Sequence, residues 1–434
     1  MSPIEQGFLA LGVGILLIGL RVPVGLALAV VSFAGLVAHI GFNSAISLVG
    51  RLPYDFAATW EFSAIPMFVL MGTIAYHSGM TTSLYKAARL WVGRLPGGLA
   101  VATNFACAGF GAASGSSLAT TVAMGKIGIP EMLRFGYHPG LATACCACGG
   151  TLAALIPPSI PLLVYGILAE ESVAKLFVAG VMPGLLTAAV YAAMVMTRCT
   201  VDPALAPPLE ERPRWSEKFA ALREIWPLPI LTIAVMGGIY GGYVSPTEAG
   251  AFGAFMAFVI ALALRTLTLD ILRRSLRDAM VTTATILFVA IGALMLSRYL
   301  ALVGLPDFIA EAVVGWSLDP MLLILATSAV YLLLGMFLDP LGIMLLTIPV
   351  FLPLFKALGY DLVWFGIVVV KFIEIGLLTP PVGLNVFAVK TLVGDTIGLE
   401  TIFKGVGWFL FAEAIVMTIL FAFPGFTLWL PSLM

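Results

Sequence analysis

Two proline-pair segments decide how this chain folds: residues 148–161 read CGGTLAALIPPSIP, and residues 374–385 read EIGLLTPPVGLN. Proline lacks a backbone donor and its ring clashes with the carbonyl four residues earlier, so two adjacent prolines interrupt a helix. The pairs lie within long apolar stretches, at 139–168 and 361–390. In a bilayer, an interrupted helix is tolerated only where protein or a cavity satisfies the freed backbone groups. The sequence therefore predicts two broken helices whose interruptions line a site.

The composition of the whole chain places these segments in a membrane. Of 434 residues, 61% are hydrophobic and 10% are charged, with a mean hydropathy of +1.08. Soluble domains are closer to half apolar and a quarter charged. The apolar residues suffice for about ten spans of about 20 residues each. The alternation typical of transmembrane strands is absent. We therefore expect an all-α polytopic membrane protein.

Several classes of function are disfavoured by what the sequence lacks. The formal net charge is −1, which gives no basic surface for nucleic acid. Neither a GxxxxGK[ST] motif nor an HExxH motif is present, so we expect no ATP motor and no catalytic zinc. Cys145, Cys146 and Cys148 suggest a metal cluster, but small residues on a tightly packed helix explain them more simply. The sequence predicts neither an enzyme nor a bound cofactor.

The two proline-pair segments belong to an internal repeat with an offset of 223 residues. Pro157-Pro158 corresponds to Pro380-Pro381, and Gly136-Tyr137 corresponds to Gly359-Tyr360. Gapless matches at the same offset are Gly14 with Gly237, Gly19 with Gly242, Pro23 with Pro246, and Pro130 with Pro353. These residues shape the backbone, as expected if a fold is repeated. We divide the chain into a first membrane repeat at 1–198, a cytoplasmic linker at 199–225 and a second, inverted membrane repeat at 226–434.

Each repeat is predicted to hold five spans and one re-entrant hairpin. The spans are expected at 5–20, 23–40, 62–79, 139–168 and 173–198, and at 226–243, 246–265, 283–303, 361–390 and 401–430. Mixed segments at 42–60, 80–95, 268–281 and 305–318 suit interfacial helices. The hairpins, at 97–135 and 320–358, have arms of about 16 residues, which reach only about 24 Å. An alternative interpretation of each hairpin is two short ordinary crossings.

The basic residues predict which way the chain is oriented, because Lys and Arg concentrate on the cytoplasmic side. With the N-terminus outside, seventeen of the 22 basic residues are cytoplasmic and only Arg51, Lys175 and Lys356 are outside. The cytoplasmic set is Arg21, Lys86, Arg89, Arg94, Lys126, Arg134, Arg198, Arg212, Arg214, Lys218, Arg223, Arg265, Arg273, Arg274, Arg277, Lys390 and Lys404. We therefore expect both termini in the periplasm and a multi-pass protein of a bacterial inner membrane.

An inverted repeat with broken helices is typical of secondary transporters. The predicted site consists of the two hairpin tips and the two proline-pair interruptions, which pair with each other at the 223-residue offset. Freed carbonyls and hydroxyls suit Na⁺, which we expect near Ser116 and Thr151 and again near Asp339 and Thr379. The candidate sodium and substrate residues are Ser114, Gly115, Ser116, Ser117, Gly149, Gly150, Thr151, Pro157, Pro158, Ser159, Gly335, Asp339, Pro340, Glu374, Gly376, Thr379, Pro380, Pro381, Gly383 and Asn385.

Some of these residues have simpler structural explanations. Asp339-Pro340 is also an ordinary helix start, with an N-cap followed by proline. The Ser-Gly-Ser-Ser stretch at 114–117 also allows close packing of the hairpin arms. Lys371 and Glu374 are spaced i, i+3, so we expect them to neutralise each other, although Glu374 adjoins an interruption and a coupling role stays open.

The sequence resembles the large membrane subunit of tripartite ATP-independent periplasmic (TRAP) transporters over essentially its whole length. The resemblance rests on PMFVLMG at 66–72, SGSSLATTVAMGKIGIPEM at 114–132, GGTLAALIPPSIPLLVYG at 149–166, SPTEAGA at 245–251 and EIGLLTPPVGLNVF at 374–387. The Ala153-Ala154 stretch before the first proline pair departs from it, because a glycine is expected nearer the prolines.

The resemblance implies an elevator architecture of the ion-transporter kind and sodium-driven uptake of a carboxylate. It also implies a periplasmic solute-binding receptor and a small four-helix membrane subunit as partners, beside the membrane lipid. The main alternative is a stand-alone divalent-anion/sodium symporter that needs no receptor. A membrane enzyme or redox subunit and an ion channel are further alternatives. The sequence does not identify the substrate, because no residue pattern in it indicates the specificity of a binding pocket.

Overall fold

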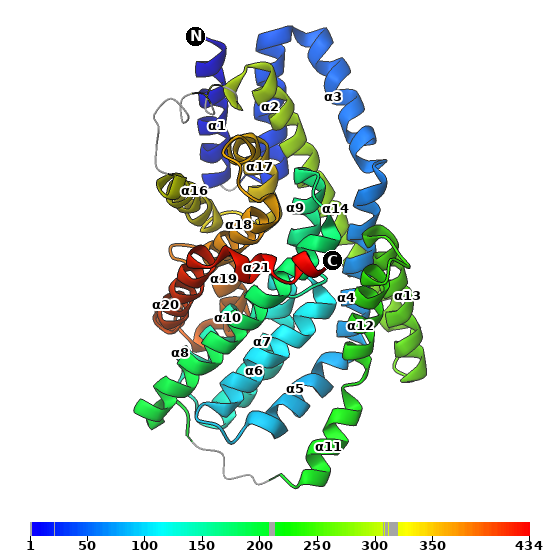
Figure 1. Cartoon of the computed structure of the whole chain (residues 1–434), viewed down its shortest axis with the longest axis vertical. Coiled ribbons are helices and arrows are strands. Elements are labelled where there is room, and N and C mark those ends of the chain that lie inside the picture. The colour runs from blue at the N-terminus through cyan, green and yellow to red at the C-terminus, as the bar shows by residue number, and fades with distance from the viewer. Residues whose placement is uncertain (1, 21, 208–212, 307, 309–310, 312–319) are drawn as a thin grey trace.

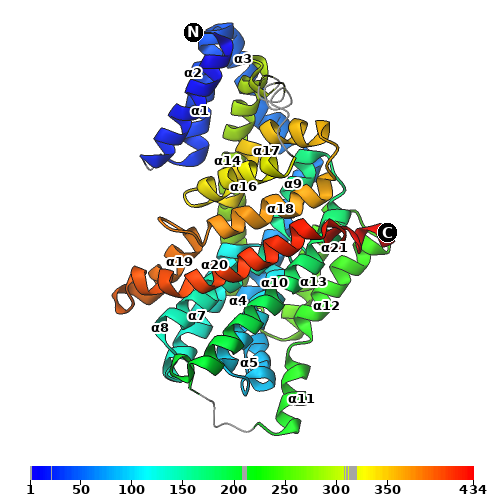
Figure 2. The same ribbon diagram turned by 60° about the vertical axis from the view of Figure 1, so that its left-hand side comes forward.

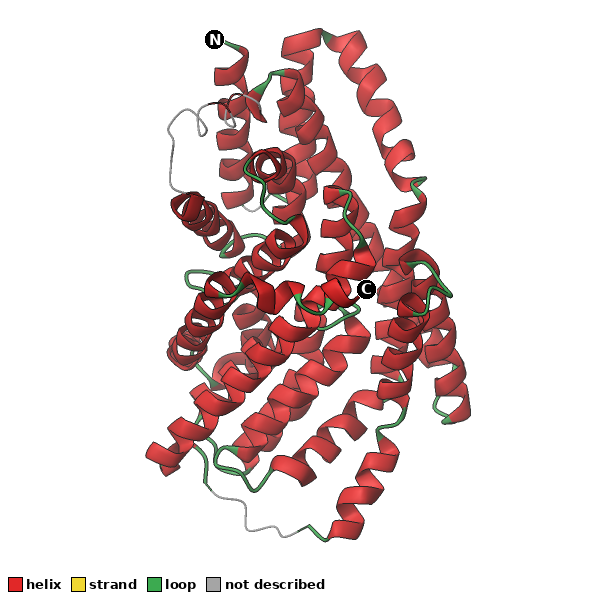
Figure 3. Ribbon diagram, in the orientation of Figure 1, coloured by secondary structure: helices red, strands yellow, loops and turns green. Residues whose placement is uncertain are grey.

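The computed structural model describes residues 2–434 except 21, 208–212, 307, 309–310 and 312–319. The described part of the chain is helical and contains no strand (Figure 3). Five of its helices are long and apolar enough to cross a membrane, or seven if two bent helix pairs each count as one span. Six shorter apolar helices accompany them. This architecture agrees with a multi-pass membrane protein.

The first half of the chain folds into eleven helices (Figure 1). They are α1 (Pro3–Gly19), α2 (Val24–Ile40), α3 (Phe42–Ala57), α4 (Ala64–His77), α5 (Met80–Val92), α6 (Gly98–Ser114), α7 (Ser117–Arg134), α8 (Pro139–Gly150), α9 (Ile160–Ala169), α10 (Val173–Val201) and α11 (Trp215–Glu224). The predicted hairpin at 97–135 is therefore α6 and α7. The predicted broken helix at 139–168 is α8 and α9, joined through a short 3₁₀ turn at Thr151–Ala154.

The second half is also helical and interrupted. Its helices are α12 (Pro227–Tyr240), α13 (Pro246–Ala263), α14 (Leu269–Leu302), α16 (Pro320–Gly335), α17 (Pro340–Ala357), α18 (Leu362–Gly376), α19 (Leu384–Val393), α20 (Leu399–Ala422) and α21 (Pro424–Leu428). The hairpin expected at 320–358 is α16 and α17, and the broken helix expected at 361–390 is α18 and α19. The peptide bonds within Pro157-Pro158 and Pro380-Pro381 are both cis.

Two of the predicted boundaries are wrong. The expected interfacial helix at 268–281 and the expected span at 283–303 form one continuous helix, α14, because no proline interrupts the segment. Apart from Arg298 near its end, its charged residues occupy its first three turns. The span expected at 401–430 ends at Ala422, since Pro424 starts α21 and restricts the residue before it. Most of the interfacial helix expected at 305–318, namely 307, 309–310 and 312–318, and part of the expected linker, 208–212, lie outside the described residues.

The helices pack in two groups. In one group, α14 lies along α2 and α4, and α4 packs against α13. In the other, α8 packs against α7 and α20, while α16 packs against α18. Figure 2 shows α19 on the opposite side of the molecule from α12 and α13, while α20 runs across it toward α21. The hairpin α6–α7 lies between the groups, because α6 contacts α4 on one side and α8 on the other.

Candidate functional site

The tip of the first hairpin is a tight turn closed by serine hydroxyls. Gly115, between α6 and α7, has a φ of +61°, which glycine adopts without the penalty of a side chain. Ser116 is the N-cap of α7, with its Oγ accepting a hydrogen bond from the Ala119 N–H at 3.4 Å. Ser114 Oγ lies 2.7 Å from Thr120 Oγ1. The tip is therefore preorganised by hydroxyl groups that lie at the edge of a cavity described below.

The first broken helix satisfies its own freed carbonyls with side-chain hydroxyls. Thr151 Oγ1 donates to the Cys148 carbonyl at 2.6 Å, and Ser159 Oγ donates to the Ala154 carbonyl at 2.5 Å. Ser159 also caps α9, accepting from the Leu162 N–H at 3.3 Å. Pro157 and Pro158 are buried. Polar groups that would otherwise be unpaired in an apolar environment are thus matched within the break.

The second hairpin and the second broken helix have the same kinds of groups. Asp339 caps α17 by accepting from the Gly342 N–H at 3.1 Å, and Thr379 Oγ1 donates to the Ile375 carbonyl at 2.7 Å. Gly335 and Gly376 bring α16 and α18 into backbone contact. A Cβ on Gly335 would lie 2.8 Å from the Gly376 Cα, so alanine does not fit there without a shift of the helices.

Four hydrogen bonds join the interruptions to one another. They are Ile160 N–H to the Gly115 carbonyl at 3.1 Å, Ser117 Oγ to Glu374 Oε1 at 3.0 Å, Gly383 N–H to the Met336 carbonyl at 3.2 Å, and Asn385 Nδ2 to the Ala147 carbonyl at 3.4 Å. Each bond links a different pair among the two hairpins and the two broken helices. The predicted site residues are therefore brought into one connected block.

The prediction that Lys371 and Glu374 neutralise each other is wrong. Lys371 forms an ion pair with Glu413 of α20 and donates to Thr187 Oγ1 of α10 at 3.1 Å. Tyr191 of α10 donates to the other oxygen of Glu413. Both charged side chains are almost completely buried, at 2% and 1% exposure. Although Glu374 is one turn away on the same helix, the Lys371 ammonium group pairs with Glu413, because packing of α20 against α18 brings that carboxylate directly to it.

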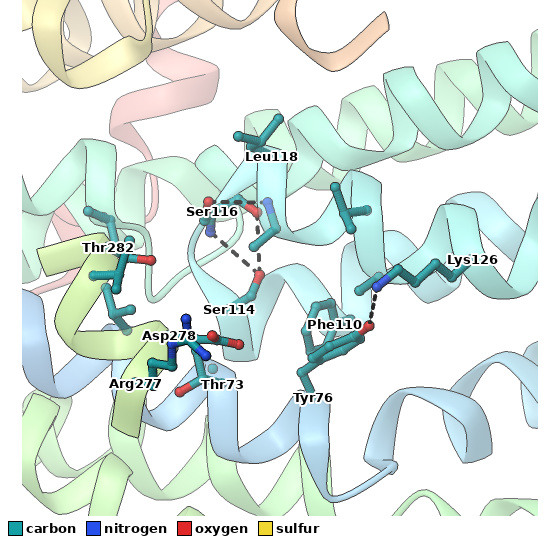
Figure 4. A pocket seen from close by; sticks show the side chains of 17 residues that line it. Thr73, Tyr76, Phe110, Ser114, Ser116, Leu118, Lys126, Arg277, Asp278 and Thr282 are labelled. Carbon is teal, nitrogen blue, oxygen red and sulfur yellow. Dashed lines mark hydrogen bonds between the residues drawn. The ribbon is translucent and has the colours of Figure 1, made fainter. Parts of the chain in front are cut away.

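A cavity of about 580 Å³ opens between the first hairpin and helices α4 and α14 (Figure 4). Ser114 and Ser116 line it, and they are the only two of the predicted site residues among its lining. The sequence argument missed Thr73, Lys126 and Arg277, which line it as well. In the sequence, Lys126 and Arg277 counted only toward the cytoplasmic charge. The available signal was that Lys126 lies on the arm that follows the glycine-rich tip, and that Arg277 lies just before a long apolar stretch.

Two cations face this cavity from different elements. Lys126 on α7 donates to the Tyr76 hydroxyl at 3.3 Å, and its Nζ lies 5.8 Å from the centre of the Tyr76 ring. Arg277 comes from α14 and is exposed. Neither cation forms an ion pair within the described part of the chain. The carboxylate of Asp278 also lines the cavity, and it lies 2.8 Å from His77 Nε2. The cavity therefore combines available positive charge with hydroxyl donors.

Comparison with known proteins identifies the family. Residues 11–426 match the family described as the tripartite ATP-independent periplasmic transporter, DctM component. The chain is 34% identical to the C4-dicarboxylate TRAP transporter large permease protein DctM of Pseudomonas aeruginosa, over 90% of each chain. It is 31% identical to the sialic acid TRAP transporter large permease protein SiaM of Vibrio cholerae, over 97% of this chain and 96% of that one.

Two solved structures share the fold at low sequence identity. The YdaH transporter of Alcanivorax borkumensis aligns with a TM-score of 0.62 at 12% identity, over 90% of each chain. MtrF of Neisseria gonorrhoeae aligns with a TM-score of 0.64 at 14% identity, over 96% of this chain and 95% of that one. Together with the family match, these likenesses agree with the resemblance seen in the sequence. The chain belongs to the family of the DctM component of tripartite ATP-independent periplasmic transporters, and it is a permease component of a transporter rather than an enzyme.

Proposed function

We propose that this chain is the membrane permease subunit of a Na⁺-coupled secondary transporter that imports a carboxylate-type solute by an elevator mechanism. The observation that carries this proposal is the cavity beside the first hairpin tip. There, Lys126 and Arg277 supply positive charge next to the hydroxyls of Ser114 and Ser116. A carboxylate is best held by charge-assisted hydrogen bonds of this kind.

The relatives support an organic acid as the substrate class. Proteins similar to this chain are described as C4-dicarboxylate, sialic acid and isethionate TRAP transporter permeases. Each of those solutes carries an acidic group. Lys126 lies on the hairpin and Arg277 on α14, so a bound carboxylate would be held between two separate elements. Replacing either cation with glutamine should raise the solute concentration needed for half-maximal transport.

Buried oxygen atoms support coupling to Na⁺. Glu374 Oε2 and Asn385 Oδ1 are buried and have no hydrogen-bond partner in the described structure. An uncompensated carboxylate inside the membrane is costly, and a hard cation with oxygen ligands relieves that cost. Glu374 is bonded to Ser117, one residue beyond the tip. We infer that Na⁺ binds near Ser116 and Thr151 and near Asp339 and Thr379, with Glu374 close to the first hairpin.

Paired local structures support the inverted repeat. At the 223-residue offset, Ser116 and Asp339 are both N-caps of the second hairpin arm. His138 and Asp361 are likewise both N-caps of the broken helices. An odd number of spans in each half would make the second half inverted. With the positive charges in the cytoplasm, both termini of this inner-membrane protein would face the periplasm.

The connected interruptions support movement as one body. The hydrogen bonds between the hairpins and broken helices are retained only if α6–α9 and α16–α19 move together. We add α10 and α20 to this body, because the buried Lys371–Glu413 pair and Tyr191 fasten them to α18. Separating these groups in lipid would cost several kcal/mol for each unpaired polar group. Helices α2, α4, α13 and α14 would form the static scaffold.

The proposal is tested by reconstitution with the periplasmic solute receptor and the small four-helix subunit. Labelled carboxylates should accumulate only with an inward Na⁺ gradient and a loaded receptor. Collapsing the Na⁺ gradient with an ionophore should abolish accumulation. Uptake that proceeds at the same rate without the receptor would favour the alternative, a stand-alone divalent-anion/sodium symporter.

A further inference from the structure

A second cavity, of about 380 Å³, lies apart from the cavity beside the first hairpin tip and shares no lining residue with it. It lies where the first turns of α8 and α20 meet the last turns of α10. Its lining includes three basic side chains and an apolar wall: His138, Leu141, Arg198, Leu205, Lys404 and Trp408. Nothing in the proposed transport cycle uses these residues.

Two positively charged side chains line this cavity, and only one of them has an acidic partner in the described structure. The Arg198 guanidinium lies 4.5 Å from the centre of the Trp408 ring and forms no ion pair within the described residues. Lys404, which also lines the cavity, pairs with Glu400 at 2.8 Å, and this pair is exposed, with exposures of 77% and 81%, so it is a weak competitor for the ammonium group. The other acidic group nearby, Asp202, caps the Ala204 N–H. No acidic side chain is among the lining of the cavity.

Neutral hydrogen-bond donors complement the two cations. His138 Nδ1 accepts from the Gly140 N–H at 3.1 Å, so in the neutral ring Nε2 carries the proton and is a donor. The Thr401 hydroxyl also lines the cavity. Two cations with two neutral donors match an anion that has several acceptor oxygens, such as a phosphate group.

The position of the cavity favours a lipid as the source of that anion. Three helix ends meet there, at the end of the molecule that the charge distribution assigns to the cytoplasm. Trp408 is 48% exposed, and tryptophan is enriched where protein meets the membrane–water interface. Leu141 and Leu205 provide apolar surface beside the charges. Basic pockets between membrane helices on the cytoplasmic side suit anionic lipid headgroups.

We propose that this cavity binds the phosphate group of an anionic phospholipid in the cytoplasmic leaflet, with Arg198 and Lys404 as the charged contacts. The same chemistry would accept a soluble phosphate, so the test compares the two sources. Because α8, α10 and α20 are fastened to the block of interruptions, a lipid held there would travel with that block.

The experiment measures phosphatidylglycerol binding to the full chain in detergent by native mass spectrometry. Phosphatidylcholine and inorganic phosphate are titrated in parallel. The test variant is R198Q with K404Q, and the charge-matched control is R94Q with R273Q, two exposed cytoplasmic cations outside the cavity. We expect phosphatidylglycerol to bind the test variant about tenfold more weakly than the wild type, since each basic contact adds to anionic-lipid affinity. The control should bind as the wild type does.

Each other outcome is decisive. Equal phosphatidylglycerol binding by the wild type and the test variant overturns the site. Binding of inorganic phosphate that is lost in the test variant, without selectivity for phosphatidylglycerol over phosphatidylcholine, supports the anion site but overturns the lipid as its source. Folding is checked by the thermal transition of each variant. K404Q alone removes only the charge of an exposed side chain and should not affect folding. A loss of lipid affinity in this folded single variant therefore supports the site independently.

Discussion

At the scale of single residues, the buried charges determine which helices belong together. Lys371 is one helical turn from Glu374, yet its ion pair is with Glu413, on a helix more than forty residues later in the chain. Sequence spacing identifies neighbours along one helix, but it does not identify what a neighbouring helix places opposite. The sequence therefore predicted correctly that Lys371 would be neutralised, but the carboxylate it named, Glu374, was wrong.

The first prediction concerns the Lys371–Glu413 pair. Glu413→Leu would leave the Lys371 ammonium buried without a counter-charge, which we expect to cost about 3–5 kcal/mol of stability. The double variant K371M with E413L removes both charges and should recover most of that loss. Thermal unfolding in detergent measures both. Lys404→Met, which breaks the exposed pair with Glu400, should leave the unfolding temperature unchanged. A double variant as unstable as Glu413→Leu alone would contradict this account.

At the scale of elements, the helix breaks were the most predictable features of this chain. The Gly-Ser and Asp-Pro tips and the two proline pairs break the helices where the sequence predicts, because proline and glycine act locally. The start of α14 was not predictable in this way. Arg273, Arg274 and Arg277 suggested a separate interfacial helix, but charged side chains do not end a helix. The cavity beside the first hairpin tip was not predictable for a similar reason, because Thr73 and Arg277 reach it only through the packing of α4 and α14 against the hairpin.

The second prediction separates capping from ion coupling at the hairpin tips. Ser116→Ala and Asp339→Ala each remove an N-cap, as does Ser172→Ala at the start of α10, which belongs to neither hairpin tip and neither proline pair. Loss of a cap costs about 1 kcal/mol in each case. We expect only the first two variants to shift the Na⁺ activation curve of uptake to higher concentration. If all three variants show wild-type Na⁺ activation at normal abundance, the tips do not bind Na⁺.

At the scale of the whole molecule, charge placement predicts the orientation in the membrane. Cysteine reporters at Lys175, in the first turn of the long helix α10, and at Ser216, on α11, are both at exposed positions. We expect a membrane-impermeant maleimide applied from the periplasm to label the first and spare the second. Permeabilised cells, in which both react, provide the control. Labelling of the Ser216 reporter in intact cells would reverse the topology.

The last prediction tests whether the interruptions move as one body past the scaffold. Tyr76 lies on α4 of the proposed scaffold and Lys126 on α7 of the proposed moving body, and the Lys126 Nζ is 3.3 Å from the Tyr76 hydroxyl. Cysteines at these two positions can therefore be joined by a short, reducible bifunctional thiol reagent. Within the body, a Cβ on Gly128 would lie 3.4 Å from the Sγ of the native Cys146, so Gly128→Cys offers a disulfide between α7 and α8 at a position outside the candidate site. Transport is measured before and after bridging of the same sample, so that the effect of the substitutions themselves cancels.

We expect the first bridge to stop uptake until it is reduced, and the second bridge to leave the rate of uptake unchanged. The reverse pattern would mean that the hairpin and the broken helix separate during transport, because only a motion between them is blocked by tying them together, and the elevator proposal would then be wrong.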